Sequence, residues 1–61
     1  MNGREIIKIL KQNNWRMVRV KGSHHLLYKD NKTVSVPVHG KKDIGIGLFK
    51  AIEKQTGVKL K

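Results

Sequence analysis

Residues 15–38 read WRMVRVKGSHHLLYKDNKTVSVPV, and they contain three runs that are rich in β-branched and aromatic side chains. These runs cover residues 15–20, 24–29 and 33–38. Gly22 in the first gap can adopt a positive φ, and Asp30 and Asn31 in the second gap are typical turn residues. Two tight turns in succession predict an antiparallel meander with residues 24–29 as its central strand. Pro37 cannot donate to a strand ladder, which favours an edge position for the third strand.

Helices are expected on both sides of this stretch. Residues 3–12, GREIIKILKQ, have apolar side chains at helical spacing, and Asn2 with Glu5 has the capping-box pattern. A second helix should begin near Ile46 and end before Gly57. The predicted fold is therefore α+β, with the order α-β-β-β-α in a single domain of residues 1–61. Both helices should pack on one face of a three-stranded antiparallel sheet, because neither can bury its apolar side alone.

Spacing also predicts which side chains form the core and how the first strand divides its faces. The expected core residues are Trp15, Ile6, Ile7, Leu10, Val34, Val36, Leu48 and Ile52. Trp15 has base stacking on RNA as an alternative role. Strict alternation along the first strand places Arg16, Val18 and Val20 on one face, and Trp15, Met17 and Arg19 on the other.

The charge of the chain points to a polyanionic partner. Fourteen Lys and Arg residues against four Asp and Glu residues give a formal net charge of +10. Such a field attracts nucleic acid, and an acidic protein is a second partner of the same kind. The chain has no cysteine, so disulfides and thiolate zinc sites are excluded. Its short apolar runs predict neither a membrane span nor a secretory signal, and we expect a cytosolic protein.

Two adjacent histidines, His24 and His25, open the predicted central strand. Consecutive strand residues point to opposite faces, so the pair cannot clasp one metal ion, and we expect neither a metal nor a cofactor. An exposed imidazole beside cationic side chains is sufficient for metal-free RNA cleavage through the ribose 2′-OH. His24 shares its face with Leu26 and Tyr28, and His25 shares its face with Leu27 and Lys29. Alternation leaves open which of the two faces is buried.

Several basic side chains are candidates for contact with RNA phosphates, the alternative being an ordinary solvated surface. They flank the two turns and the loop after the third strand: Arg16, Arg19, Lys21, Lys29, Lys41 and Lys42. Lys41 and Lys42 are the strongest of these, because they precede a helix N-terminus that favours an anion. Tyr28, on the face of His24, is a candidate for substrate contact.

Three segments together resemble the HicA family of bacterial and archaeal toxins. They are WRMVRVKGSHH at residues 15–25, VSVPVHG at residues 34–40, and I-G-x-x-K-x-I-E-K-Q-T-G at residues 46–57. The resemblance extends from the first helix to Gly57. It implies a fold like that of a double-stranded-RNA-binding domain, and the activity of an mRNA interferase. Thr56 stands where the family pattern suggests Ala, a difference that concerns helix packing.

The resemblance also implies roles for particular residues. The family's catalytic histidine directly follows Gly-Ser, which here makes it His24, with Gly22 and Ser23 forming the preceding turn. His25 receives no role. His39 matches the histidine after V-P-x and is expected to support catalysis or to contact RNA. The implied partner is HicB, an antitoxin that binds the toxin and blocks its active site.

The leading hypothesis is a metal-independent ribonuclease toxin with His24 as general base or acid. Lys21, Lys41 and Lys42 would then help to hold the RNA. The alternative is a non-catalytic RNA-binding module of the same fold, and a third interpretation is a basic ribosome-associated peptide. Neither the residue that complements His24 nor the RNA sequence that is cleaved follows from the chain.

Overall fold

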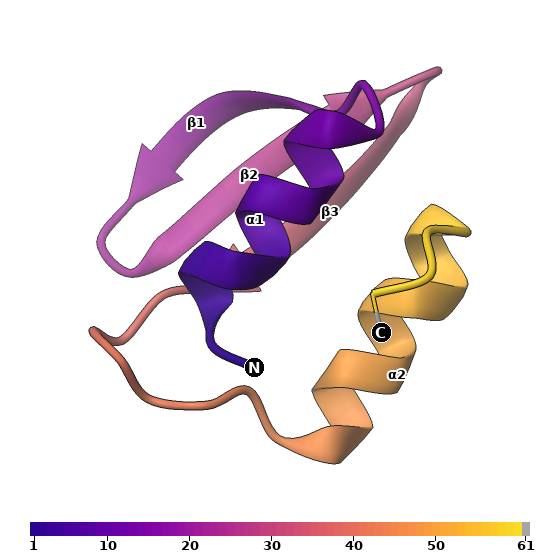
Figure 1. Cartoon of the computed structure of the whole chain (residues 1–61). Coiled ribbons are helices and arrows are strands. Elements are labelled where there is room, and N and C mark those ends of the chain that lie inside the picture. Colours follow the sequence, from indigo (N-terminus) through magenta and orange to yellow (C-terminus); the bar gives the residue numbers. More distant parts are fainter. Residues whose placement is uncertain (61) are drawn as a thin grey trace.

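A computed structural model describes residues 1–60 and shows a three-stranded antiparallel sheet with two helices (Figure 1). The elements follow the chain in this order: α1 Gly3–Gln12, β1 Arg16–Lys21, β2 His24–Lys29, β3 Lys32–Pro37 and α2 Ile46–Thr56. The sheet order β1-β2-β3 makes β2 the central strand and leaves β3 with its Pro37 at an edge. The predicted α+β fold is confirmed. No helix within residues 1–60 is both long and apolar enough to cross a membrane.

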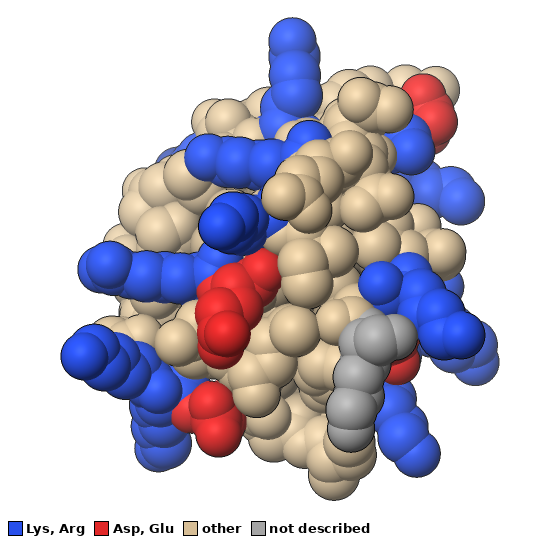
Figure 2. Space-filling view, in the orientation of Figure 1, with Lys and Arg blue, Asp and Glu red and all other residues tan. Residues whose placement is uncertain are grey.

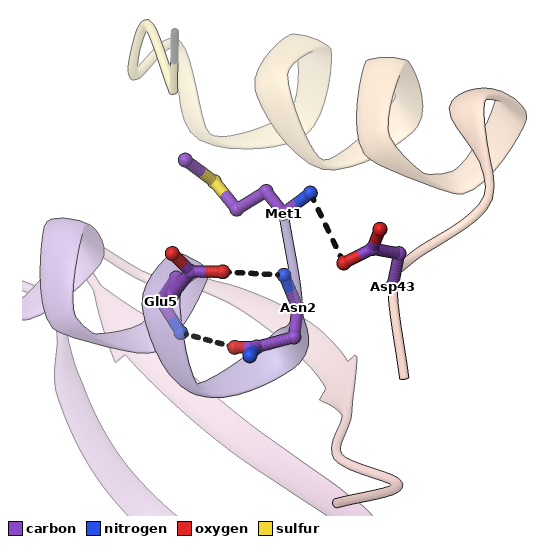
Figure 3. Close-up of polar contacts among 4 residues, drawn as sticks. All are labelled: Met1, Asn2, Glu5 and Asp43. Atoms are coloured by element: carbon purple, nitrogen blue, oxygen red, sulfur yellow. Dashed lines mark hydrogen bonds and ion pairs between the residues drawn. The ribbon is translucent and has the colours of Figure 1, made fainter. Parts of the chain in front are cut away.

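Helix α1 begins with the capping box that its sequence predicts. Asn2 Oδ1 accepts a hydrogen bond from Glu5 N, and Glu5 Oε1 accepts one from Asn2 N, each at 2.9 Å (Figure 3). This reciprocal capping box satisfies two of the amide groups that a helix start leaves unpaired. After the helix, Asn14 has a φ of +70°, which turns the chain into β1.

The two hairpins of the sheet use different turns. Lys21 pairs with His24 across Gly22 and Ser23, and only Gly22 has a positive φ, of +59°. That sign pattern is the one found in type II′ turns. Lys29 pairs with Lys32 across Asp30 and Asn31, whose φ angles of +48° and +66° fit a type I′ turn. Both turns match the right-handed twist of the strands they join.

The core lies between the helices and one face of the sheet. Figure 1 views the sheet from this side, with α1 in front of the strands and α2 toward β3. The buried side chains are Ile6, Ile7 and Leu10 of α1, Trp15, Leu27, Val34 and Val36 of the sheet region, Ile52 of α2, and Leu60. The predicted core is confirmed for all of its members except Leu48.

Leu48 is 42% exposed, so its prediction as a core residue is wrong. Only Ile52 is fully buried within α2, and Phe49 packs partly against the core. Fewer side chains of α2 are therefore buried than its apolar spacing predicts. Trp15 is 3% exposed and belongs to the core, which rules out its use for base stacking.

Strand β1 contains an irregularity that changes its faces. Met17 pairs with Leu27 and Arg19 pairs with Leu26, so Val18 is an additional residue with no partner on β2. One inserted residue reverses the alternation beyond it. The expected division, with Arg16, Val18 and Val20 on one face, is therefore wrong.

Candidate active site

The register of the sheet decides which histidine faces solvent. Leu27 lies opposite Val34 and His25 lies opposite Val36, and paired residues of an antiparallel sheet share a face. Leu27, Val34 and Val36 are buried under the helices. His25 is therefore on the covered face and partly buried, whereas His24 is exposed on the open face.

On the covered face, the side chain of His25 contacts Met17 of β1. Its Nδ1 lies 3.3 Å from the sulfur of Met17, and both residues point to the helix side of the sheet. A thioether is a weak acceptor, so this contact fits an imidazole that carries its proton on Nδ1. His25 is thus a packed residue near the edge of the core.

His24 occupies the first position of β2, directly after the Gly22–Ser23 turn. Lys21 is its partner on β1, and Cβ atoms of directly opposed residues are about 5 Å apart. Lys21 is therefore the cationic side chain that the register brings nearest to the His24 imidazole. An added Cβ at Gly22 would meet nothing within 4 Å, so its positive φ, rather than lack of space, is what favours glycine there.

Pro37 of β3 lies on the other side of His24. Its carbonyl oxygen and the Val38 side chain abut Gly3 at the start of α1, where any side chain would collide with them. Beyond Pro37, the Val38 amide donates to the Ser23 carbonyl oxygen at 2.7 Å. The backbone on this side of His24 is therefore fixed both by α1 and by the turn.

His39 follows Val38 and enters the loop that leads to α2. This residue is exposed and leaves the sheet beside the Gly22–Ser23 turn, at the same end as His24. Its carbonyl oxygen accepts a hydrogen bond from Lys42 N at 3.1 Å, and Gly40 between them has a φ of +59°. The structure therefore brings His24, Lys21 and His39 to one end of the sheet.

The far end of the same loop is tied to the start of the chain (Figure 3). The Ile44 amide donates to the Met1 carbonyl oxygen at 2.9 Å, and the Met1 amino group lies 3.4 Å from Asp43 Oδ1. Lys41 and Lys42 are exposed on this anchored loop. They precede α2, and residues 43–45 lie between them and its first turn at Ile46.

Tyr28 lies on the open face with His24, as expected, and is 36% exposed. Its hydroxyl donates to Asn31 Oδ1 at 2.9 Å, which ties the side chain to the second turn. Four residues of strand place Tyr28 about 13 Å from His24. The two side chains therefore cannot act on the same atom, although they can contact one extended ligand.

Lys29 differs from the other predicted phosphate contacts. Its position in β2, two residues after Leu27, places it on the covered face. Its Nζ donates to the carbonyl oxygen of Asn13 at 3.1 Å. This interaction places a positive charge at the C-terminal end of α1, where the helix dipole favours it. Lys29 thus stabilises the fold and does not contribute to the open face.

The open face carries no carboxylate. None of the three strands contains Asp or Glu. Glu5 belongs to the capping box, Asp43 pairs with the amino terminus, and Glu53 Oε2 accepts a bond from Leu60 N. Asp30 lies in the turn between β2 and β3, at the end of β2 away from His24. On the helix side, acidic atoms lie among the Lys and Arg side chains (Figure 2). The surroundings of His24 are therefore cationic.

A shallow apolar pocket of about 250 Å³ lies elsewhere in the molecule. Its lining consists of Met1, Ile44, Ile46 and Phe49. None of these side chains transfers protons or carries charge, and none is a predicted site residue. Among residues 1–60, no group of three His, Asp or Glu side chains is arranged to hold a metal ion.

The sequence pattern did not predict that Arg16, Arg19 and Lys21 share one face of the sheet. All three lie opposite open-face residues of β2, because the extra residue Val18 shifts the register between Arg16 and Arg19. A signal was present in the segment RMVRVK, whose basic residues depart from a period of two. They share a face only if one residue is inserted between the two arginines.

The protein is a small basic domain with a solvent-exposed histidine on its sheet. Comparison with known proteins shows which class of protein has this arrangement. Residues 3–58 match a family described as the HicA toxin of bacterial toxin–antitoxin systems. The chain thus belongs to the toxins of these systems. Within them it is a member of the HicA toxin family, because the match covers nearly the whole chain.

A curated relative has a similar sequence. It is a probable mRNA interferase HicA from Pseudomonas fluorescens (strain Pf0-1), 46% identical over 39 residues. The aligned segment covers 64% of this chain and 65% of the relative. The match therefore spans just under two thirds of the relative's length.

Proposed function

We propose that this protein is a ribonuclease toxin that cleaves mRNA, with His24 as the proton-transfer residue. The observation that carries the proposal is the register, which leaves His24 exposed beside Lys21 on a sheet face without carboxylates. Membership of the HicA toxin family and the name of the relative, a probable mRNA interferase, support the same activity. The formal net charge of +10 supports RNA as the substrate.

The proposed reaction uses the ribose of the substrate and needs no metal ion. His24 either removes the proton of the 2′-OH or protonates the leaving 5′-oxygen, and His39 or a water molecule makes the other proton transfer. The 2′-oxygen attacks the adjacent phosphorus. The P–O5′ bond breaks, which yields a 2′,3′-cyclic phosphate and a 5′-hydroxyl. Lys21 stabilises the negative charge that builds up on the phosphate oxygens. Such general acid or base catalysis contributes about 10²–10⁴-fold to the rate.

His39, Ser23 and Gly22 have supporting roles in this proposal. His39 is the histidine that leaves the sheet beside the same turn, and it is the candidate to complement His24. Ser23 accepts the Val38 amide and so ties the His39 loop to the turn. Gly22 provides the positive φ that closes the turn before His24. Lys41 and Lys42 extend the cationic surface along the loop.

The proposed partner is a HicB-type antitoxin that covers His24, and the proposed location is the cytosol, where mRNA is found. A family of toxins from toxin–antitoxin systems supports a neutralising partner in general. The cationic surface favours an acidic binding segment on that partner.

One observation favours a second function, that of a non-catalytic RNA-binding module. The strands provide no carboxylate beside His24, so the second proton transfer falls to His39 or to water. Without that transfer, the same face would bind RNA and leave it intact.

Incubation of the purified protein with RNA in EDTA distinguishes these functions. Cleavage with cyclic phosphate ends supports the metal-independent nuclease, and intact RNA under conditions of tight binding supports the binding module. His24→Ala is expected to lower the cleavage rate by about 10²–10⁴-fold. The matched control is His25→Ala, which removes the same side chain from the covered face. Equal cleavage by the His24→Ala variant and the wild type would refute the assignment of His24.

A further inference from the structure

The additional residue in β1 gathers three cations beside His24. Before Val18, Arg16 lies opposite Tyr28. After it, Arg19 lies opposite Leu26 and Lys21 lies opposite His24. All three basic side chains therefore point to the open face. With strict alternation, Arg16 would point to the face opposite that of Arg19 and Lys21.

These cations form a row parallel to β2, which we call the β1 track: Arg16, Arg19 and Lys21. The track runs alongside the segment from His24 to Tyr28, which spans about 13 Å. Its three side chains are exposed, and none has an ion-pair partner within residues 1–60. The strands contain no Asp or Glu, and Asp30 in the second turn forms no ion pair with these side chains, so the charges are available to an external anion.

The end of the track distant from His24 has an aromatic side chain. Tyr28 lies directly opposite Arg16, and its hydroxyl is held by Asn31. Its partner on β3 is Thr33, which is exposed. An exposed aromatic ring beside a cation offers stacking to an unpaired base and neutralisation to its phosphate. A duplex hides its bases and offers no such ring contact, so the arrangement favours single-stranded RNA.

We propose that the β1 track and Tyr28 bind a single-stranded RNA segment that extends from the cleaved bond at His24 toward the second turn. Phosphates contact Arg16, Arg19 and Lys21, and one base stacks on Tyr28. This inference rests on the proposed function and adds the path of the RNA to it. Arg16 and Tyr28 are binding residues here, since they lie too far from His24 to touch the reacting atoms.

RNA binding is best measured in a His24→Ala background, so that cleavage does not interfere. Fluorescence anisotropy of a labelled single-stranded RNA over a range of salt concentrations yields the affinity and its salt slope. Arg16→Gln and Arg19→Gln should each weaken binding and reduce the slope by about 0.7, the value for one phosphate contact on a single strand. The matched control is Lys8→Gln, which removes the same charge from the exposed side of α1.

Tyr28→Leu tests the stacking end of the track. Loss of one stacked base should weaken binding by about 5- to 150-fold and leave the salt slope unchanged, because no phosphate contact is lost. An unlabelled single strand should compete more strongly than a duplex of the same length. Thermal unfolding of each variant confirms that the fold is retained before binding is compared.

Arg16→Gln is the decisive variant, because only the shifted register places it with Lys21. If it binds RNA like Lys8→Gln, or if the duplex competes equally well, the proposed path is wrong. If the variants lose an acidic protein partner but keep their RNA affinity, the track is a protein interface and the proposal also fails. A different result separates the two proposals. If the track variants weaken RNA binding as expected but the wild-type protein does not cleave RNA, the catalytic proposal fails and the proposed RNA path stands.

Discussion

The two faces of the sheet differ in what they require of their side chains, although the same three strands build both. The covered face depends on apolar volume: Leu27 and Val36 are fully buried and Val34 is 2% exposed. The open face displays His24, Tyr28 and the β1 track, all of which are exposed. A substitution on the covered face should therefore change stability, and one on the open face should change function with little effect on stability.

The sharpest test of this comparison uses the neighbouring leucines of β2. Leu27→Ala removes a fully buried side chain and should lower the free energy of unfolding by about 2–5 kcal/mol. Leu26→Ala on the open face should cost about 1 kcal/mol or less, because Leu26 is only partly buried. Urea denaturation of both variants measures the difference. Equal losses would contradict the assignment of the faces.

Gly3 connects the two faces, because its contact with Pro37 supports the strand opposite His24. Gly3→Ala should destabilise the protein by about 1–3 kcal/mol through overpacking, although alanine is the better helix former. It should also lower RNA cleavage, since Pro37 must shift. The control Gly47→Ala meets nothing within 4 Å and should stabilise α2 by about 0.5–1 kcal/mol. A stabilising effect of Gly3→Ala would refute the close approach.

A smaller effect on stability is expected at the turn that precedes His24. Gly22→Ala forces a positive φ on an L-residue and should cost about 1–2 kcal/mol. Gly45→Ala, at an open position without a positive φ, is the control and should cost less. Because the turn positions Lys21 and His24, cleavage should fall more than the loss of folded protein explains. Unchanged specific activity of the folded fraction would show that the turn geometry does not limit catalysis.

Much of the fold was predictable because local chemistry determines it. The capping box of Asn2 and Glu5 and the two hairpin turns depend on neighbouring residues and match their predictions. The error at Leu48 has a different origin. Apolar spacing identifies a helix, but the width of its buried face depends on how α2 meets the sheet.

The candidate site was predictable only in part, for the same reason. Alternation placed His24 and His25 on opposite faces, and the resemblance to the HicA family favoured His24. The alternation of the strand alone does not show which of the two faces is buried. The β1 track was not predicted, since one additional residue at Val18 reverses the parity of everything beyond it.

The order of helices and strands, the turns, the surface charge and the separation of His24 from His25 onto opposite faces all follow from the amino-acid sequence. These properties depend on residues that are close along the chain. Which face of the sheet the helices cover, and therefore that His24 is exposed and His25 packed, follows from the folded structure alone. The folded structure also places Arg16 with Arg19 and Lys21. Burial and strand register depend on contacts between segments that are distant along the chain. The residues of a single strand therefore do not specify them.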